Sequence, residues 1–563
     1  MNVASLVLER AQSEPDAPAI HFPVGRAPDG TTGFETATNR DLDLDSDAIA
    51  HGLEQIGVVR GMRTALMVRP SLDLFVLMLA LFKTGAIPVL IDPGIGLRRL
   101  RRCLGEAEPE AFIGIAQAQA ARVALGWARA SVRIVVTVGR RFGWGGTTLA
   151  ALREAGSSHG NTPYPIPSTR DEDDAAILYT SGSTGPPKGV IYRHSNFAAQ
   201  IEAIRNLVHI EPGEIDLPTF APFALFDPAL GMTSLIPEMD PTRPGSVDPR
   251  RILQPAERFG ATNLFGSPAL LETVGRYGVL HGVKLSTLRR VVSAGAPVSA
   301  ETMARFLELL PDDAEIHTPY GATECLPVSC ISSREVLGET AALTDAGAGV
   351  CVGAPVPSIE VRILAIDDGP IEKWAPALEL GVGQIGEIVV RGPQATAAYL
   401  NRPEATALAK ISDPEVPEGF WHRMGDTGYL DAHGRLWYCG RKADRVERPG
   451  ETLHSIPVEA VFDTHESVLR TALVGVPGII ETVPVLCVEL LEGVPNSASR
   501  TIADELRTIG ARFSHTRCIS HVLFHPRFPV DIRHNAKIGR PALARWATRQ
   551  LRGRLDIPAA GPS

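Results

Sequence analysis

The chain has 563 residues, of which 44% are hydrophobic and 21% are charged, and its formal net charge is −9 at pH 7. This length predicts two or more domains, and the composition is typical of a soluble globular enzyme. The acidic balance argues against broad electrostatic binding to nucleic acid or to acidic membranes. The local exception is a basic cluster that we interpret as a solvated helix face: Arg98, Arg99, Arg101 and Arg102.

The cysteines and the apolar stretches bear on the compartment. The seven cysteines are scattered and form no Cys-x-x-Cys pair. This pattern favours free thiols in a reducing cytosol, and we expect a cytoplasmic protein. Residues 1–16 have no basic region of the kind that opens a signal peptide. The apolar run 74–82 is too short to span a bilayer, so we expect no transmembrane segment and interpret the run as a buried helix that leads into a strand.

Short buried strands alternate with helical patterns in the first part of the chain, after an amphipathic helix at the N-terminus. Alternation of this kind predicts parallel sheets with helices on both faces. The expected elements are strands over 19–22, 64–68, 87–91, 111–115, 133–138 and 175–179, and helices over 42–56 and 72–82.

The second part of the chain changes character twice. The apolar segment 218–244 contains repeated prolines and cannot be one regular element. It either lines a hydrophobic cavity or covers a core. Further β/α units are expected at 263–266 and 290–295, and strands at 360–366, 386–391 and 435–439 shift the balance toward β.

These patterns predict an α/β protein with a mobile C-terminal part. We expect a large N-terminal domain, over 1–440, of parallel-type β-sheets flanked by helices, with a β-rich subdomain. Residues 441–445 are polar and are expected to form a hinge. A small α+β domain is expected over 446–550, followed by a tail over 551–563.

A loop rich in glycine and hydroxyl groups follows the strand at 175–179. Glycines let successive backbone N–H groups point at one anion, hydroxyls add donors, and Lys188 adds a positive charge. The loop is not a Walker motif, because Lys188 follows two prolines and no hydroxyl follows it. We interpret it as a phosphate-binding loop with the sequence Thr180-Ser181-Gly182-Ser183-Thr184-Gly185-Pro186-Pro187-Lys188-Gly189.

This loop resembles the signature of the adenylate-forming superfamily, which includes acyl-CoA synthetases, luciferases and peptide-synthetase adenylation domains. Further motifs resemble those of the superfamily and occur in the expected order. They are SAGAP at 293–297, YGATE at 320–324, MGD at 424–426, GR at 440–441 and NAKIGR at 535–540. The resemblance covers roughly residues 1–550 and implies ATP and Mg²⁺ as cofactors.

The resemblance also implies a role for each motif. The ring of Tyr320 would stack on adenine, Thr323 would offer its hydroxyl to phosphate or acyl oxygen, and Glu324 would ligate Mg²⁺. Asp426 would accept hydrogen bonds from the ribose hydroxyls, and Lys537 would neutralise charge on the phosphate. The expected ATP-binding residues are Thr180, Ser181, Gly182, Ser183, Thr184, Gly185, Lys188, Ala294, Gly295, Ala296, Pro297, Tyr320, Gly321, Asp426 and Arg441, and the expected catalytic residues are Lys537, Thr323 and Glu324.

One position departs from the superfamily pattern. The residue two after the arginine of the GR motif is usually Asp or Lys, and here it is Ala443, with Asp444 next to it. Domain rotation is still expected, because Lys537 must reach a site on the large domain and later leave it. The identity of the pivot stays open.

Four stretches are similar to the bacterial OleC-type β-lactone synthetases, namely 141–149, 217–231, 318–328 and 528–540. This resemblance implies activation of a long-chain 2-alkyl-3-hydroxyalkanoic acid as an acyl-adenylate, followed by attack of its own 3-hydroxyl to close a β-lactone. Asp227 is a candidate for the base in that step, and a structural aspartate is the alternative. The alternative reactions are long-chain acyl-CoA or acyl-AMP ligation and, more distantly, a nucleotide-binding scaffold without turnover. Family analogy adds three partner enzymes: a thiolase-like condensing enzyme, a ketoreductase and a β-lactone decarboxylase.

Overall fold

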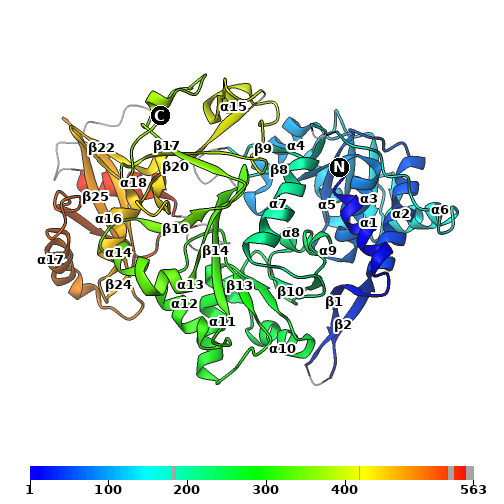
Figure 1. Ribbon diagram of the computed structural model, residues 1–563, viewed down its shortest axis with the longest axis horizontal. Helices are drawn as coiled ribbons and strands as arrows, with labels where there is room; N and C mark the ends of the chain where they lie inside the picture. Colours follow the sequence, from blue (N-terminus) through cyan, green and yellow to red (C-terminus); the bar gives the residue numbers. More distant parts are fainter. Residues whose placement is uncertain are drawn as a thin grey trace.

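The computed structural model describes residues 1–28, 30–170, 172–180, 186–417, 419–478, 480–530 and 538–552. In Figure 1 the chain runs from the blue N-terminal elements at one end of the molecule, through green strands in the middle, to the orange C-terminal elements at the opposite end. The expected α/β class is confirmed, because two large sheets are covered by helices along most of the chain.

The first sheet is built from the N-terminal region and has seven strands in the order β7-β6-β5-β3-β4-β8-β9. All neighbours pair in parallel except β8 and β9, which form an antiparallel pair around the glycine-rich loop. The strands are β3 (Arg63–Met67), β4 (Ile87–Leu90), β5 (Ala111–Ile115), β6 (Ile134–Val138), β7 (Thr147–Thr148), β8 (Asp174–Tyr179) and β9 (Gly189–Arg193).

The apolar run at 74–82 forms the buried helix that the sequence predicts. It lies in α3 (Leu72–Thr84), where the Ser71 side chain caps the Leu74 N–H and Gly85, with φ 70°, ends the helix. The chain then enters β4 within two residues. Among the described residues, every helix is too short or too polar to cross a membrane.

The second sheet has fourteen strands, of which thirteen follow the order β17-β18-β20-β21-β16-β15-β14-β13-β12-β10-β11-β1-β2, with β19 paired to β20. The pairs from β1 through β11, β10, β12 and β13 to β14 are parallel, and the pairs on either side of this block are antiparallel. The strands are β1 (Pro18–Arg26), β2 (Thr32–Thr38), β10 (Ile215–Pro218), β11 (Thr233–Leu235), β12 (Asn263–Phe265), β13 (Arg290–Val292), β14 (Glu315–Ala322), β15 (Cys325–Ser332), β16 (Val350–Pro355), β17 (Glu360–Leu364), β18 (Gly386–Arg391), β19 (Lys410–Ser412), β20 (Phe420–Leu430) and β21 (Leu436–Arg441).

The C-terminal region builds two small sheets of its own. The hairpin of β22 (Val446–Arg448) and β23 (Glu451–Leu453) precedes a three-stranded sheet in the order β24-β25-β26. These three strands are β24 (Val468–Pro477), β25 (Thr482–Leu490) and β26 (His521–Phe524). Helix α18 (Arg540–Leu551) packs against β24, and its buried Leu543 and Ala547 join the core of this region.

The other helices cover the sheets and connect their strands. The proline-rich segment 218–244 is broken into short pieces, as expected, and includes α8 (Ala221–Ala224), α9 (Asp227–Leu230) and β11. The remaining α-helices are α1 (Ala4–Ser13), α2 (Asn39–Gln55), α4 (Leu97–Ala107), α5 (Ala116–Leu125), α6 (Leu149–Ser157), α7 (His194–Leu207), α10 (Arg250–Phe259), α11 (Pro268–Leu280), α12 (Ala300–Leu307), α13 (Ser333–Glu335), α14 (Ala341–Asp345), α15 (Pro403–Ala409), α16 (Ser455–Asp463) and α17 (Ser499–Gly510).

The arginine cluster and the cysteines agree with two further expectations. The four arginines of the basic cluster lie on α4 and are all exposed, as a solvated helix face requires. The seven cysteines are free thiols, so the prediction from their scattered spacing is confirmed.

Candidate active site

Three of the predicted motifs lie at or just beyond the carboxyl ends of strands with a parallel neighbour. Thr180 follows β8 directly, Ala294 lies two residues after β13, and Tyr320 lies near the end of β14. Ligands of open α/β sheets bind at this edge, because loops that leave parallel strands converge there. The topology of the fourteen-stranded sheet places Ala294 and Tyr320 at the ends of neighbouring strands, and Thr180 follows a strand of the seven-stranded sheet.

Asp426 lies at the centre of a buried polar group. It faces Arg441 across the β20–β21 ladder, and Arg441 Nη1 is 2.9 Å from Asp426 Oδ1. The Tyr320 hydroxyl donates a hydrogen bond of 2.7 Å to Asp426 Oδ2. Burial raises the pKa of the Asp426 carboxyl, and the charge of Arg441 opposes this shift. These contacts join the predicted adenine, ribose and arginine motifs into one cluster.

Asp426 also keeps acceptor capacity for a ligand. Its side chain is 4% exposed, and Oδ1 accepts no hydrogen bond from any described residue, since Arg441 lies close but with poor hydrogen-bond geometry. A buried carboxylate oxygen without a donor is costly unless another group supplies one. The two hydroxyls of a ribose would supply such donors.

Glu324 is held at the turn between β14 and β15. Its main-chain oxygen accepts a 2.9 Å hydrogen bond from the Thr396 N–H, and its Oε1 accepts a 2.7 Å hydrogen bond from the Tyr399 hydroxyl. The carbonyl of Thr323 accepts a hydrogen bond from the Tyr192 hydroxyl. A Cβ at Gly321 would come within 2.7 Å of the Cys325 carbonyl oxygen, so this tight turn requires glycine.

The ends of the glycine-rich loop meet at its base. The Thr180 N–H donates to the Lys188 carbonyl at 3.1 Å, and the Lys188 N–H donates to Thr180 Oγ1 at 3.4 Å. Lys188 Nζ lies 4.6 Å from the centre of the Tyr399 ring, a cation–π contact. Tyr399 therefore contacts both Lys188 and Glu324. Residues Ser181, Gly182, Ser183, Thr184 and Gly185 lie outside the described residues.

The adenine-side turn, Ala294-Gly295-Ala296-Pro297, follows β13 as expected. Its Gly295 has φ 95°, a backbone conformation that glycine adopts without strain. The Ser293 N–H bonds to the His317 carbonyl at 2.9 Å, which ties the start of the turn to β14. Ala294 also lines an internal cavity.

Lys537 lies outside the described residues, but the segment on either side of it is anchored. Val530 and Ile538 form an antiparallel bridge, and the Gly539 N–H donates to the Pro529 carbonyl at 2.7 Å. Next to them, Arg540 Nη2 donates to Glu459 Oε2 at 2.9 Å. These contacts hold the described chain just before and just after the residues around Lys537.

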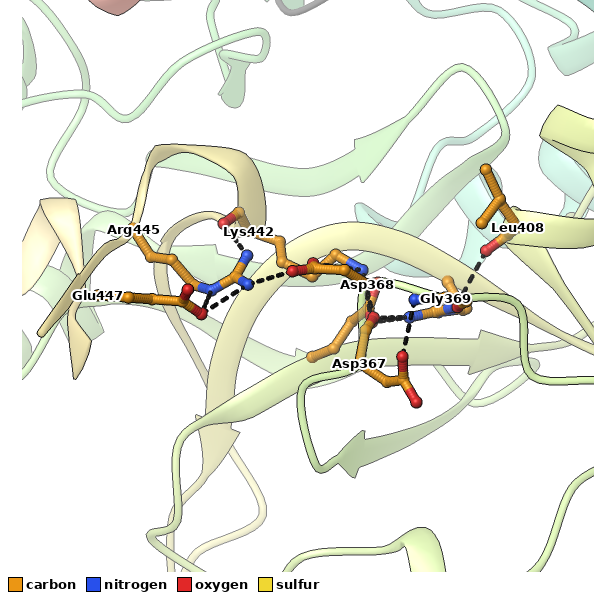
Figure 2. Close-up of polar contacts among 9 residues, drawn as sticks. Asp367, Asp368, Gly369, Leu408, Lys442, Arg445 and Glu447 are labelled. Carbon is orange, nitrogen blue, oxygen red and sulfur yellow. Dashed lines mark hydrogen bonds and ion pairs between the residues drawn. The ribbon is translucent and has the colours of Figure 1, made fainter. Parts of the chain in front are cut away.

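The predicted hinge, 441–445, begins at the last residue of β21 and is rich in ion pairs. Figure 2 shows Lys442 and Arg445 reaching toward the 367–369 loop. Lys442 Nζ donates to the Asp367 carbonyl at 2.9 Å, and Arg445 Nη2 donates to Asp368 Oδ2 at 2.6 Å. Asp444 instead pairs with Arg540 Nε at 3.2 Å. Every residue of 442–445 except Ala443 thus has a charged partner.

Three residues near Glu324 were not predicted from the sequence. They are Tyr399, Lys410 and His422. Lys410 Nζ donates to the Thr396 carbonyl and lies 3.0 Å from His422 Nδ1. Burial lowers the pKa of Lys410 to about 7, although the Glu324 carboxylate opposes the shift. These side chains stand in stretches with no periodic or motif signal, so only the fold reveals them.

Protein ligands for a metal are few at this site. The described residues include no group of three or more His, Cys, Asp or Glu side chains arranged to hold an ion. Mg²⁺ in nucleotide sites is bound through one or two carboxylates together with substrate phosphates. The single carboxylate of Glu324 fits that donor set.

Comparison with known proteins identifies the class to which this fold and site belong. Residues 7–400 match the family of AMP-binding enzymes. The chain belongs to this family, and the predicted resemblance to the adenylate-forming superfamily is confirmed.

Individual relatives narrow the comparison. The chain is 54% identical over 558 residues to "Olefin beta-lactone synthetase" of Stenotrophomonas maltophilia (strain K279a), covering 98% of this chain and 99% of the relative. It is 51% identical over 552 residues to the protein of the same name from Xanthomonas campestris pv. campestris, covering 98% of each. The fold is shared with the amide bond synthetase McbA from Marinactinospora thermotolerans, with TM-score 0.76, 23% identity, and coverage of 97% of this chain and 99% of that one.

Proposed function

We propose that the protein is an ATP-dependent β-lactone synthetase. The observation that carries the proposal is the identity of 54% to an olefin β-lactone synthetase over nearly the full length of both chains. The proposed substrate is a long-chain 2-alkyl-3-hydroxyalkanoic acid. Its carboxylate attacks the α-phosphorus of ATP and releases pyrophosphate, and its 3-hydroxyl then attacks the acyl-adenylate carbonyl and expels AMP.

The residues of the site have distinct tasks in this proposal. Asp426 and Arg441 bind the ribose, Tyr320 stacks on adenine, and Lys188 holds the departing pyrophosphate. Glu324, oriented by Tyr399, would hold Mg²⁺, which neutralises phosphate charge when bound. Because the protein does little covalent work in such a reaction, positioning and electrostatics dominate. The intramolecular attack then gains from proximity, so no external thiol is needed.

A product assay without CoA tests the proposal. With ATP, Mg²⁺ and the 3-hydroxy acid, we expect pyrophosphate release and a product whose mass is that of the acid minus one water. The matched 2-alkyl acid without the 3-hydroxyl should release pyrophosphate and give no lactone. If mass spectrometry finds only a thioester when CoA is added, and no lactone when CoA is omitted, acyl-CoA ligation replaces this proposal.

Substitution of Glu324 tests the proposed metal ligand. Glu324→Gln keeps an acceptor for the Tyr399 hydroxyl but removes the negative charge. We expect the Mg²⁺ concentration for half-maximal pyrophosphate release to rise by at least about tenfold. The exposed Glu308 offers a control, since Glu308→Gln should leave the magnesium dependence unchanged. Equal magnesium dependence in the wild type and Glu324→Gln would remove Glu324 from the ligand set.

The chemistry also defines the neighbouring reactions in a pathway. A carbon–carbon condensation followed by reduction of a 3-keto group must supply the 3-hydroxy acid, and a decarboxylation would consume the β-lactone. We therefore retain the thiolase-like condensing enzyme, the ketoreductase and the β-lactone decarboxylase as proposed partners, and the cytoplasm as the proposed compartment.

A further inference from the structure

An apolar cavity begins beside the adenylation motifs and continues into the second sheet. Its lining includes Ala294 of the adenine-side turn and Pro319, which precedes Tyr320. The rest is mostly hydrocarbon, for example Phe223, Phe226 and Met232. The proline-rich segment 218–244 therefore lines a cavity, and its Ala224 and Leu235 also pack in the hydrophobic core, so both interpretations left open by its sequence apply. Because the cavity borders the motif residues, the acyl group of an acyl-adenylate is the ligand that would enter it.

Strand register shows how far Asp216 lies from the motif residues. Asp216 on β10 is level with Asn263 on β12, and Asn263 is level with Arg290 on β13. Ala294 lies four residues beyond Arg290, which at about 3.3 Å per residue places Asp216 roughly 13 Å below the motif residues. Asp216 also lines the cavity, so it lies at the end of the cavity that is far from Ala294 and Pro319.

Two buried carboxyls meet at this far end. Ser234 on β11 is the register partner of Asp216, and its hydroxyl donates a 2.6 Å hydrogen bond to Asp227 Oδ2. Asp216 is 7% exposed and Asp227 is 3% exposed. Through Ser234, which is level with Asp216, Asp227 also lies at this end of the cavity.

No described cation pairs with either carboxyl. The nearby Arg290 bonds to Glu214 Oε1 at 3.0 Å and to Asn263 Oδ1 at 2.9 Å instead. Burial raises the pKa of both aspartates, and the charge of Asp216 raises the pKa of Asp227 further. The end of an otherwise apolar cavity is thus closed by polar groups that hydrocarbon cannot satisfy.

We propose that Asp216 and Asp227 form the floor of the acyl cavity and limit the length of the hydrocarbon branch that it accepts. The proposal rests on the proposed function, because it takes the ligand to be a long-chain acyl-adenylate. Each methylene that enters the apolar part of the cavity leaves water and tightens binding. A methylene placed against the two carboxyls gains no binding free energy, because hydrocarbon offers these polar groups no hydrogen bond.

Binding of non-hydrolysable acyl-adenylate analogues of increasing chain length tests the floor directly. With acyl sulfamoyl adenosines measured by isothermal titration calorimetry, we expect each methylene to tighten binding about fourfold until the chain reaches the floor. Beyond that length the wild-type affinity should stop rising. In Asp227→Ala, which removes the polar group and adds space, the gain should continue for at least one more methylene.

Three further variants separate a polar floor from general damage. Asp227→Asn keeps both the shape and a polar group, so it should keep the wild-type limit. Asp312→Ala, at an exposed position, is the matched control for loss of a carboxylate. If Asp227→Ala does not fold, Asp216→Val is measured, because a β-branched side chain suits its strand.

The same length limit in Asp227→Ala, or in Asp216→Val where Asp227→Ala does not fold, would overturn the inference. So would a wild-type affinity that rises throughout the series or that does not depend on length. The readout is binding and does not depend on the product. Absence of lactone in the product assay would therefore overturn the proposed function while leaving a measured length limit intact.

Discussion

Lys537→Ala is expected to slow ATP–pyrophosphate exchange by about 100- to 1000-fold, the usual cost of removing one preorganised electrostatic contact from a transition state. In the adenylation step two anions approach each other and negative charge develops on the phosphate oxygens, which the ammonium would neutralise. The Val530–Ile538 bridge and the Arg540–Glu459 ion pair are formed by residues that the substitution leaves unchanged. The substitution should therefore leave the thermal unfolding temperature nearly unchanged.

The exposed Arg527 provides the control for this variant. Arg527→Ala removes a positive charge near the same segment, and exchange should stay at the wild-type rate. Unchanged exchange in Lys537→Ala would contradict the role that the sequence motif predicts for this lysine. A large fall in the unfolding temperature would instead point to a structural role.

Asp426→Asn is expected to raise the KM for ATP by about 10- to 100-fold, because hydrogen bonds to a charged acceptor contribute about 1.5–3 kcal/mol. The amide keeps an acceptor for the Tyr320 hydroxyl but removes the charge that faces Arg441. The substitution also replaces one carboxylate oxygen by an amide NH₂ group, which donates hydrogen bonds and cannot accept one from a ribose hydroxyl. The measurement is the ATP dependence of pyrophosphate exchange, together with thermal unfolding to separate affinity from stability.

Tyr320→Phe is the comparison for this effect. It removes the hydroxyl that donates to Asp426 and keeps the ring that would stack on adenine. The KM for ATP should change much less than in Asp426→Asn. A KM for ATP in Asp426→Asn equal to that of the wild type would remove Asp426 from the nucleotide site.

The parts of the fold that could be predicted from the sequence are those with a local signal. The run at 74–82 is apolar because it packs in the hydrophobic core, and α3 extends two residues beyond it at each end. Parallel strands buried on both faces are continuous apolar runs, so β5 and β8 appear where expected. The order of the superfamily motifs along the chain then predicts that the loops carrying them form one ATP-binding site.

The side chains that orient the motif residues had no such signal. Tyr399 contacts Glu324 across 75 residues of sequence, and Lys410 stands in a short edge strand. Asp216 is one acid within an ordinary strand, and its significance depends on its register with Ser234. Contacts of this kind depend on the order of the strands. The sequence pattern predicts parallel sheets with helices on both faces, but it does not predict that order.

At the end of β21, the residue proposed to bind the ribose is also the first residue of the predicted hinge. Arg441 faces Asp426 in the last position of the ladder, and Lys442, the next residue, begins the turn tied to Asp367 and Glu387. Two residues later Asp444 is fastened to Arg540 at the start of α18. Arg441, which is proposed to bind the nucleotide, is thus the direct neighbour in sequence of the segment that leads to the C-terminal elements. If Arg441 binds the ribose as proposed, a change of ligand there would act directly on the chain segment that leads to the C-terminal elements, without passing through the protein core.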